Sequence, residues 1–533
     1  MLREIKKAAL STCLPLAALV FLTSLLIRLP LLPVPFERDE GEYSYIAWRM
    51  GYHEIPYRDW FDQKPPGIFW AYRLALFLPM DPIRSVHLVG ALFAAATALA
   101  LFFLARRWLP DFWAAFAGIL FGVVSPQPSL QGIAANTELF MLLPLTLSVL
   151  AFVAAADTER PSIPLMLLCG ALTGVAAAFK QVAAVNWLFL ALAWPLVARA
   201  RGKCRTSALF AGCSLAGAAI PWAALALYFT VRGAFRDFLD NVLFHNFEYM
   251  GRLSWNDRLG LLHGALRSLA PSQVVVWLFS LAGIISAFGA GRARWAIVCL
   301  LWGLTSMAGV AAGGYFFGHY FLQLLPWLCL TAALGAAALQ QWWLARGLPL
   351  WPARCLLAAA PLALPLVTLA PFLSKYSPEE AVTRIYPENR FALMPELGRR
   401  LAEITPPDQR VFVFGAEPEL LFYARRASAT RYIFLFPLYG PYSNVKEKQI
   451  AASVEIAKAR PGGALFLPNQ LFFTPGTEHF FTTWSLEYLN GNFIPDRWLT
   501  QGSNGQFTII PAVPGAPPPN QPLDSLGILL RKK

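Results

Sequence analysis

Residues 83–105 read IRSVHLVGALFAAATALALFFLA, and no ionisable side chain follows Arg84 and His87 within this stretch. An α-helix rises about 1.5 Å per residue, so the stretch is long enough to cross the hydrocarbon core of a bilayer, which is about 30 Å thick. A helix is expected because it satisfies every backbone polar group within the segment, where lipid offers no hydrogen-bond partner. Residues 112–156 and 207–229 are similarly poor in charge. The sequence therefore predicts an α-helical polytopic membrane protein.

The composition of the whole chain agrees with this prediction. Of its 533 residues, 57% are hydrophobic and 14% are charged, whereas soluble domains carry about 25% charged residues. The formal net charge of +13 suits either nucleic-acid binding or membrane orientation. Much of the basic charge lies in short connections between apolar runs, and no basic face is interleaved with aromatic residues. We therefore expect contact with membrane lipids and no nucleic-acid partner.

Apolar runs of this kind predict eleven spans. They lie at approximately 8–27, 83–105, 112–130, 139–156, 162–179, 183–198, 207–229, 272–289, 295–312, 320–339 and 353–373. The first run follows three basic residues, as a signal peptide does, but it has no small-residue cleavage site and is expected to remain as a span. All seven cysteines fall in or beside predicted spans, so no disulfide framework is expected.

The basic residues of the short connections predict the orientation of the spans. If the N-terminus is cytoplasmic, the inside connections hold Arg106, Arg107 and the basic cluster 199–205. The outside turns near 131–138 and 313–319 hold no Lys or Arg. This is the positive-inside pattern, which predicts a cytoplasmic N-terminus. After an odd number of spans, the rest of the chain would lie outside.

The sequence divides at about residue 374. Residues 1–373 are predicted to form the membrane domain, with a long first outer loop at 28–82. Residues 374–533 have a soluble composition, and alternating helix and strand patterns predict an extracytoplasmic α/β domain. The expected helices are 389–404, 417–426 and 446–459, the expected strands are 411–414, 432–434 and 464–467, and the Pro-rich run 511–522 is expected to be a linker or turn before a last short strand.

Polar residues from five separate stretches fall at the predicted outer surface of the membrane. Charged groups near membrane depth are costly, so such a convergence is a candidate functional site. The residues of this candidate site are Asp39, Glu40, Tyr43, Lys64, Asn136, Glu138, Lys180, His319, Tyr320 and Gln323.

Two residues of the first outer loop carry the chemistry of this hypothesis. A carboxylate at Asp39 could accept the proton of an attacking hydroxyl group as a general base, although a solvated acidic loop balanced by Arg38 would have the same composition. Lys64 precedes two prolines that fix the local backbone, and it could bind a lipid phosphate. A lysine that reaches from the interface to water would explain Lys64 equally well.

The other candidates also have structural explanations. Glu138 would be favoured in the first turn of a helix, with Asn136 as its N-cap. Lys180 could anchor the end of a span, and His319 could be a hydrogen-bonded residue of the interface. The residues alone leave these alternatives open.

Five motifs, in order along the chain, resemble glycosyltransferase family 39. They are Arg-Asp-Glu-x-x-Tyr at 38–43, Lys-Pro-Pro at 64–66, Asn-x-Glu at 136–138, Phe-Lys-Gln at 179–181 and Gly-His-Tyr-Phe-Leu-Gln-Leu-Leu-Pro at 318–326. The family includes protein O-mannosyltransferases and bacterial enzymes that transfer aminoarabinose to lipid A. The likeness covers roughly residues 25–340, and the tail segment 412–418 also resembles the tails of bacterial members.

The resemblance implies a GT-C fold and an inverting transfer of a hexose or pentose from a polyprenyl-monophosphate carrier. The acceptor would be a lipid, glycan or protein of the envelope, reached from a bacterial-type plasma (inner) membrane. Asp39 matches the family's essential acid, and Lys64 matches the lysine that approaches the carrier phosphate. Glu40, Glu138 and His319 would then bind the sugar or the acceptor.

One departure from the family leaves part of the chemistry open. Aminoarabinose transferases tend to have an acidic residue immediately before the lysine, and Gln63 stands there in this sequence. A divalent metal ion and aminoarabinose as the sugar are therefore both left open. A transporter or flippase for a lipid-linked saccharide is the main rival function, but it would need polar sites near the bilayer midplane. A scaffold whose outer domain binds a partner would tolerate the loss of Asp39.

Overall fold

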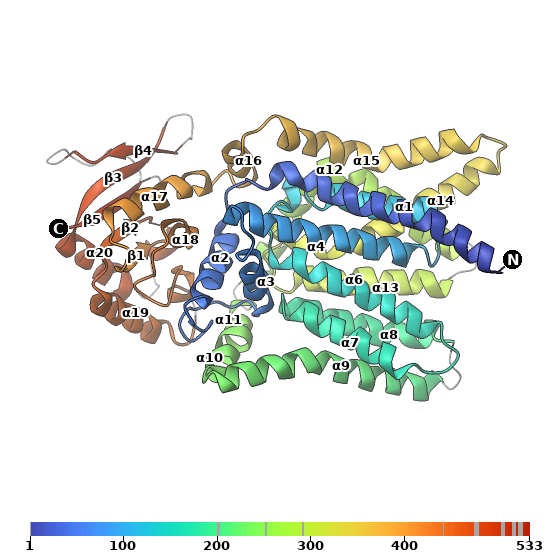
Figure 1. Ribbon diagram of the computed structural model, residues 1–533, viewed down its shortest axis with the longest axis horizontal. Helices are drawn as coiled ribbons and strands as arrows, with labels where there is room; N and C mark the ends of the chain where they lie inside the picture. The colour runs from blue at the N-terminus through green and yellow to red at the C-terminus, as the bar shows by residue number, and fades with distance from the viewer. Residues whose placement is uncertain are drawn as a thin grey trace.

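The computed structural model describes residues 2–199, 203–250, 253–289, 293–440, 442–468, 470–473, 479–502, 507–513, 519–520 and 526–533. Figure 1 shows a helical bundle that contains the N-terminus and, at the other end of the molecule, a tail that contains a small sheet. Helices of the first loop and of residues 235–250 lie between the two.

Eight helices of the bundle are long and apolar enough to cross a membrane. They are α1 (Leu2–Arg28), α4 (Pro82–Ala105), α6 (Thr137–Ala156), α9 (Lys203–Val231), α12 (Trp255–Gly289), α13 (Ala293–Ala311), α14 (Leu325–Leu344) with the preceding turn η5 (Gly318–Leu324), and α15 (Leu350–Ser374). Three shorter apolar helices are α5 (Asp111–Val124), α7 (Ile163–Ala177) and α8 (Val185–Val197), the last following η3 (Gln181–Ala184). Each predicted span contains one of these helices.

Two boundaries differ from the prediction for local reasons. The third predicted span, 112–130, ends as a helix at Val124, because Pro126 and Pro128 cannot continue the hydrogen-bond ladder; a short turn, η2 (Pro128–Leu130), follows. Helix α12 begins at Trp255, well before the predicted start, and carries Pro271 in its interior. Its polar first turns extend beyond the apolar run that marked the span.

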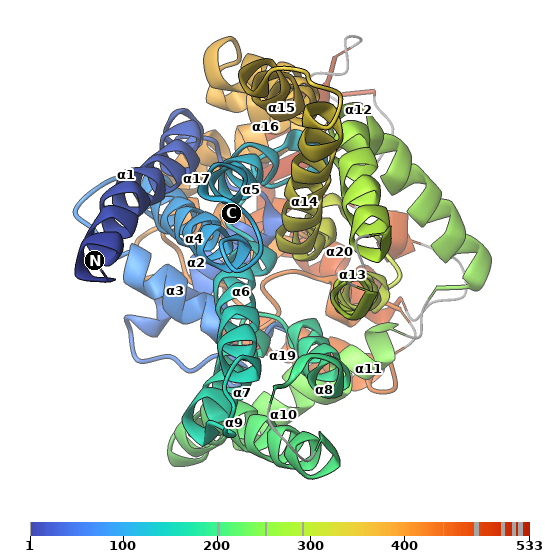
Figure 2. The same ribbon diagram turned by 90° about the vertical axis from the view of Figure 1, so that its right-hand side faces the viewer.

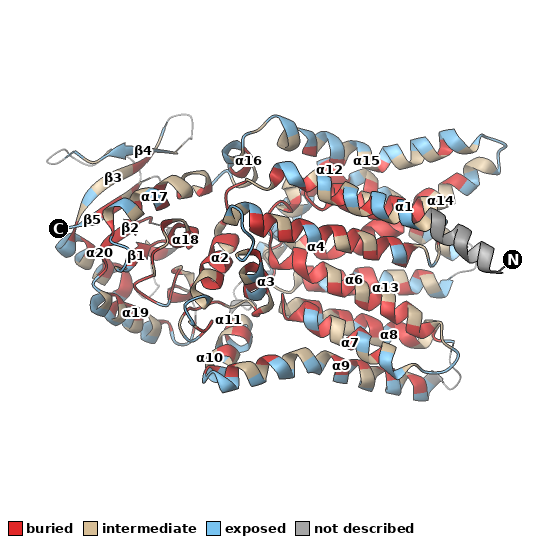
Figure 3. Ribbon diagram, viewed as in Figure 1, coloured by how far each residue is buried: buried red, intermediate tan, exposed pale blue. Residues whose placement is uncertain are grey.

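The outer faces of the bundle are apolar. Large hydrophobic side chains on α9, α12 and α15 are exposed, among them Leu227, Ile285 and Val367 (Figure 3). Between helices, small residues allow close approach: a Cβ on Gly335 would overlap the carbonyl oxygen of Phe279 across the α12–α14 contact. Small residues at helix contacts and apolar outer faces are typical of membrane bundles. The protein is an integral membrane protein with a helical membrane fold.

The first loop forms two helices that cross the end of the bundle, α2 (Arg38–Met50) and α3 (Gly67–Ala75). In the view along the bundle from its N-terminal end, both lie behind the spans (Figure 2). The start of α2 is fixed by a capping box, in which Glu37 accepts from the Glu40 backbone N–H and Glu40 accepts from that of Glu37. Helices α10 (Phe235–Leu239) and α11 (His245–Met250), joined by the π-helical turn η4 (Asp240–Phe244), lie at the same end.

The tail is a five-stranded mixed sheet with helices around it. The strands are β1 (Val411–Phe414), β2 (Gly463–Phe466), β3 (Phe493–Gln501), β4 (Phe507–Pro511) and β5 (Gly527–Lys532), in the spatial order β1-β2-β5-β3-β4. β1 and β2 are parallel, and the other neighbours are antiparallel. The helices and turns are α16 (Pro378–Ile385), η6 (Phe391–Leu393), α17 (Met394–Ile404), α18 (Glu419–Ala424), η7 (Phe436–Leu438), α19 (Val445–Ala459), η8 (Gln470–Phe473) and α20 (Phe480–Asn492).

The predicted strand 432–434 is wrong. The segment just before residues 432–434 meets the outer edge of β1 instead, through a single bridge between Ser428 and Val411. The chain then turns away from the sheet, and the carbonyl oxygen of Arg431 accepts from the backbone N–H of Phe61 in the first loop. The other expected helices and strands of the tail are present, and the Pro-rich run 511–522 lies largely outside the described residues.

The tail packs directly on the first loop. Helix α18 approaches α2 so closely that a Cβ on Gly41 would overlap Glu419. Buried residues of α2, α3, α17, α18 and the sheet form one continuous hydrophobic cluster, which includes Tyr45, Leu397 and Leu420. The position of α2 is therefore set by the bundle on one side and by the tail on the other.

Candidate active site

A cavity of about 540 Å³ lies where the bundle, the first loop and the tail meet. All five stretches that the sequence singled out contribute to its lining, and so do helix α11 and the tail. The polar and charged lining residues include Glu37, Arg38, Asp39, Glu42, Gln63, Lys64, Gln131, Thr137, Glu138, Lys180, Gln181, Asn246, Tyr315, His319, Tyr320, Tyr386 and Asn389.

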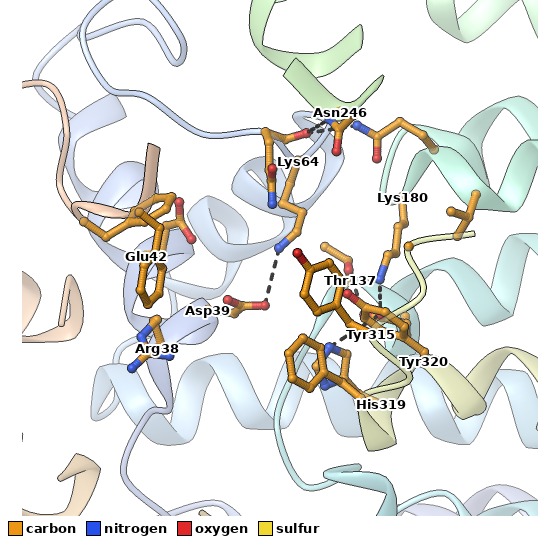
Figure 4. A pocket seen from close by; sticks show the side chains of 18 of the residues that line it. Arg38, Asp39, Glu42, Lys64, Thr137, Lys180, Asn246, Tyr315, His319 and Tyr320 are labelled. Carbon is orange, nitrogen blue, oxygen red and sulfur yellow. Dashed lines mark hydrogen bonds and ion pairs between the residues drawn. The ribbon is translucent and has the colours of Figure 1, made fainter. Parts of the chain in front are cut away.

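Asp39 and Lys64 face each other in this cavity (Figure 4). Asp39 lies in the first turn of α2, where the helix dipole favours a carboxylate. Lys64 Nζ lies 3.4 Å from Asp39 Oδ2 and donates a 3.0 Å hydrogen bond to Tyr43 Oη. Tyr43 Oη in turn donates to Asp39 Oδ2 over 3.4 Å. The three side chains thus form a closed triangle, with Tyr43 fully buried behind the charged pair.

The backbone around Lys64 is held on three sides. Its N–H donates to Asp62 Oδ1 (2.7 Å), and its carbonyl oxygen accepts from Tyr57 Oη (2.7 Å). Three residues on, the N–H of Gly67 donates to the carbonyl oxygen of Ala178 (2.8 Å). A Cβ on Gly67 would lie 2.5 Å from that oxygen, so only glycine permits this approach. The Lys-Pro-Pro segment therefore presents the ammonium group from a fixed position.

Both members of the pair are charged at neutral pH. Burial alone would raise the pKa of Asp39, but interactions with nearby groups, of which the Lys64 ammonium contributes most, lower it by more, and its pKa lies below the ordinary value. Burial alone would lower the pKa of Lys64, but Asp39 and the neighbouring acidic groups raise it well above its ordinary value. Asp39 is therefore a carboxylate that can accept a proton, and Lys64 is a cation.

A second set of charges lies across the cavity, on the bundle side. Lys180 forms an ion pair with Glu138, and its Nζ lies 3.9 Å from the centre of the Tyr320 ring. His319 Nε2 lies 3.7 Å from Glu138 Oε1, and the other ring nitrogen, Nδ1, donates to Gln131 Oε1 (2.7 Å). This arrangement brings Glu138, Lys180, His319 and Tyr320 together from three different connections.

Glu40 lies outside the cavity, although the sequence assigned it to substrate. Its Oε1 accepts from the backbone N–H of Ala135 (2.7 Å) and lies 2.8 Å from His87 Nε2, and its other oxygen closes the capping box. His87 Nδ1 lies 2.9 Å from the carbonyl oxygen of Leu32. Both ring nitrogens of His87 thus face oxygen atoms, and the ring is held at both of its polar edges. The buried pair joins α2 to α4 and helps to hold α2, whose first turn carries Asp39.

Two other predicted residues also lie away from the large cavity. Asn136 occupies the N-cap position of α6 but makes no capping hydrogen bond, and both polar atoms of its buried side chain lack a partner among the described residues. Gln323 is buried between α6, α8 and α13, against Gly309, and lines a void of about 10 Å³. Neither side chain is positioned to touch a ligand in the cavity.

Carboxyl groups are abundant near Lys64, but they are not arranged for a metal. Glu42 and Asp62 lie near each other and are both buried. Burial and the neighbouring Asp62 raise the pKa of Glu42 well above its ordinary value, and burial raises the pKa of Asp62 to about 6. Among the described residues, no group of three or more His, Cys, Asp or Glu side chains could hold a metal ion. This donor set does not fit the divalent ion that the sequence left open.

The part of the cavity lining that the tail supplies was hardly predictable from the sequence. Tyr386, Asn389 and several aromatic rings reach the cavity from there. One sequence signal did point to the tail, namely the resemblance of segment 412–418 to bacterial family members. In this segment, the carbonyl oxygen of Ala416 accepts a 2.5 Å hydrogen bond from Arg38 Nε. Arg38 Nη2 also donates to Asn389 Oδ1 (3.2 Å). The tail thus holds the residue that immediately precedes Asp39.

Comparisons with known proteins agree with this geometry. The profile of the family described as dolichyl-phosphate-mannose-protein mannosyltransferase matches residues 63–234. No curated protein matches the sequence. The structure is similar to ArnT from Cupriavidus metallidurans bound to undecaprenyl phosphate, with a TM-score of 0.58 and 17% identity over 87% of this chain and 94% of that one.

A second solved structure is similar over an even larger part of the chain. It is the archaeal oligosaccharyltransferase AglB from Archaeoglobus fulgidus in complex with an inhibitory peptide and a dolichol-phosphate. The TM-score is 0.54, and the identity is 12% over 94% of this chain and 75% of that one. The chain therefore has the GT-C fold, and over residues 63–234 its resemblance to glycosyltransferase family 39 is confirmed.

Proposed function

We propose that the protein is a glycosyltransferase that moves a sugar from a polyprenyl-monophosphate carrier to an acceptor hydroxyl group, with inversion at the anomeric carbon. The observation that carries the proposal is the pair of opposite charges, Asp39 and Lys64, 3.4 Å apart in a cavity of about 540 Å³ at the end of the spans. Such a cavity has room for a sugar phosphate and for part of an acceptor. Two relatives of the same fold contain a polyprenyl phosphate, undecaprenyl phosphate in ArnT and dolichol-phosphate in AglB, which supports this class of carrier.

In the proposed reaction, each charge has one task. The bond between the anomeric carbon and the phosphate oxygen breaks, while a bond from the acceptor oxygen forms on the opposite face of the sugar. Asp39 takes the proton of the acceptor hydroxyl group, which is general-base catalysis. Lys64 balances the negative charge that remains on the departing polyprenyl phosphate. Because Tyr43 donates a hydrogen bond to Asp39 and accepts one from Lys64, it still holds Asp39 when the phosphate draws Lys64 away.

The charges on the bundle side would hold the donor. Lys180 is the cation of the bundle side, and its ammonium group lies over the Tyr320 ring and against Glu138. Hydroxyl groups of a sugar can accept from Lys180 and donate to Glu138, while His319 supplies a further polar edge. We assign Glu138, Lys180, His319 and Tyr320 to the binding of the sugar phosphate. Glu40 is assigned to the positioning of α2.

The proposed orientation follows the positive-inside pattern. The cavity and the tail would face the outside of a bacterial-type plasma (inner) membrane, and the N-terminus would lie in the cytoplasm. The short connections with basic residues support this, because Arg106, Arg107 and Arg199 line a hollow at the opposite end of the bundle from Asp39. The acceptor would then be a lipid, glycan or protein of the envelope.

Transport of a lipid-linked saccharide is less well supported by the interior of the bundle. The polar groups between α6, α7, α8 and α13 are neutral in the described residues that line the small void there, including Asn186, Thr305 and Gln323. That void measures about 10 Å³, which is enough for one water molecule and far too small for a sugar. A transporter would need its substrate site inside the bundle, near the bilayer midplane.

The two functions are separated by one assay. The full-length protein is reconstituted in liposomes with a radiolabelled polyprenyl-phosphate sugar and an extract of envelope acceptors. Transfer predicts release of free polyprenyl phosphate and a labelled acceptor on the side that the tail faces. Movement of intact donor across the bilayer, without cleavage, would support a flippase and contradict the transferase. Mass analysis of envelope glycans in a deletion strain would then identify the sugar and the acceptor.

A further inference from the structure

The cavity has two chemically different ends. On the bundle side its lining is charged, with Lys180 and Glu138. On the tail side the lining is aromatic, and its rings belong to Phe391, Phe434, Phe436 and Tyr442, with Phe61 of the first loop beside them. In Figure 4, Asp39 lies between these two ends, with Lys180 and Tyr320 on one side and Arg38 on the other.

The two central rings are exposed to the cavity by the local backbone. Phe434 and Phe436 are partly exposed, whereas the intervening Leu435 is fully buried in the core of the tail. Alternate residues therefore point in opposite directions, and the two phenylalanines point toward the cavity. Apolar rings are normally removed from water on folding. Two neighbouring rings left partly uncovered at one wall of a cavity indicate a surface that a ligand covers.

Arg38 supplies a polar rim to this aromatic wall. Its guanidinium carbon lies 5.5 Å from the centre of the Phe436 ring and 5.7 Å from that of Phe391. The group is held by Ala416 and Asn389 through Nε and Nη2. Arg38 Nη1 and Asn389 Nδ2 donate no hydrogen bond to any described residue, so both remain able to meet an oxygen atom of a ligand.

We infer that this aromatic wall is the acceptor subsite and that its ligand is a saccharide. The inference rests on the proposed glycosyl transfer, which requires the acceptor to reach Asp39 from the side opposite the carrier phosphate. A pyranose ring has a face of C–H groups that packs on an aromatic ring and an edge of hydroxyl groups that suits Arg38 and Asn389. The saccharide presents a hydroxyl group to Asp39. Its oxygen bonds to the anomeric carbon as the bond from that carbon to the phosphate oxygen breaks, the hydroxyl proton passes to the Asp39 carboxylate, and the polyprenyl phosphate departs on the Lys64 side.

Other occupants fit this wall less well. The isoprenoid chain of the carrier belongs at the depth of the spans, whereas the rings are supplied by the tail and the first loop, beyond the end of the bundle (Figure 1). A peptide acceptor in extended form would need a row of free backbone groups to pair with. The outer edge of β1 is partly occupied by the bridge to Ser428 and by the hydrogen bond from Ala429 N–H to Val411.

The test uses binding, so that it does not depend on turnover. Full-length wild-type protein in lipid nanodiscs is probed with a panel of defined oligosaccharides, a panel of serine- and threonine-containing peptides, and undecaprenyl phosphate. The double variant Phe434→Leu/Phe436→Leu keeps apolar volume but removes both flat ring faces. Phe480→Leu, at an exposed phenylalanine of α20 that does not line the cavity, is the matched control.

The wild type and Phe480→Leu should bind at least one oligosaccharide, and the double variant should bind it on the order of tenfold more weakly. Undecaprenyl phosphate should bind all three proteins equally, and their melting temperatures should agree. The inference is overturned if the wild type binds peptides and no oligosaccharide, or if the double variant retains full affinity for the saccharide. It is also overturned if the double variant loses the carrier as well. Failure of transfer itself would appear separately, as absence of donor cleavage by the wild type.

Discussion

The two ends of the helical bundle carry similar charged residues in opposite environments. At the cavity end, Glu138 and Lys180 pair with side-chain exposures of 2% and 13%. At the other end, Asp157 pairs with Arg107 and Arg199, and the exposures of these three side chains are 30%, 42% and 68%. Exposed pairs interact weakly because water screens them. Buried pairs must offset the cost of leaving water.

The difference shows where charge is kept for a purpose other than stability. Solvated arginines at the end of a span orient the protein and need no further partner. The cavity, by contrast, encloses two ion pairs, Asp39–Lys64 and Glu138–Lys180. The buried carboxyl group of Glu42 lies with them. Replacing such groups with apolar residues would often stabilise a protein. Among the residues that the structure describes, enclosed ion pairs of this kind occur at the cavity end of the bundle and not at the other, which agrees with the proposal that the cavity binds a charged ligand.

The largest effect on stability is expected from breaking a buried pair. Glu138→Gln leaves Lys180 enclosed without its partner, and unfolding in detergent should require about 3–5 kcal/mol less free energy than for the wild type. The double variant Glu138→Gln/Lys180→Met should recover much of this loss, because no unpaired charge remains. A single variant as stable as the wild type would mean that the pair is solvated, like the one at the opposite end.

Loss of the cation beside Asp39 should have its effect on catalysis. Lys64→Met is expected to lower the rate of transfer by about 10²-fold or more, since a preorganised charge contact to the phosphate is removed. It should also weaken the binding of undecaprenyl phosphate. Lys446→Met, at an exposed lysine of the tail, is the control for loss of one positive charge. Equal carrier affinity in both variants would assign the phosphate to another group.

The carboxyl pair behind Lys64 makes stability depend on pH. The pKa values of Glu42 and Asp62 are raised in the folded protein, so their contribution is fully present below their ordinary pKa values and is lost as the pH rises through the raised ones. Between pH 5 and pH 8, the wild type should lose on the order of 2 kcal/mol more stability than Glu42→Gln. If the stabilities of the two proteins changed with pH in parallel over this range, the raised pKa values of this pair would be contradicted.

The smallest effect is expected at the end far from the cavity. Asp157→Asn removes the partner of two exposed arginines, and the free energy of unfolding should change by less than about 1 kcal/mol. Measured beside Glu138→Gln, it compares the same chemical change in the two environments. A loss as large as that of Glu138→Gln would show that burial does not distinguish the two ends.

Much of the fold could be predicted from the sequence because lipid imposes a simple rule on each span. A run such as 83–105 must be a helix whatever its neighbours are, and all eleven predicted spans contain one. The tail obeys no such rule. Residues 432–434 have a strand-like composition, but the preceding segment already meets the edge of β1, and the chain turns toward the first loop.

The candidate site could be predicted in part for a similar reason. Short connections cannot leave the end of the bundle, so Lys180 and His319 had to lie near one another once the spans were placed. Contacts across hundreds of residues could not be found in this way: Arg38 and Asn389 are 351 positions apart, and no spacing links them. The direction of a side chain could not be predicted either: Asp39 was expected to act as the base and Glu40 to bind the substrate, but only Asp39 faces the cavity, and Glu40 faces His87.

The central claim is that the Asp39 carboxylate accepts the proton of the acceptor in a cavity shared with Lys64. The most direct test is transfer from a polyprenyl-phosphate sugar by reconstituted Asp39→Asn, beside Asp408→Asn at an exposed site of the tail. We predict that Asp39→Asn loses about 10²–10⁴-fold in rate, while it melts like the wild type and still binds undecaprenyl phosphate, and that Asp408→Asn transfers normally. Transfer by Asp39→Asn at the wild-type rate would contradict the account.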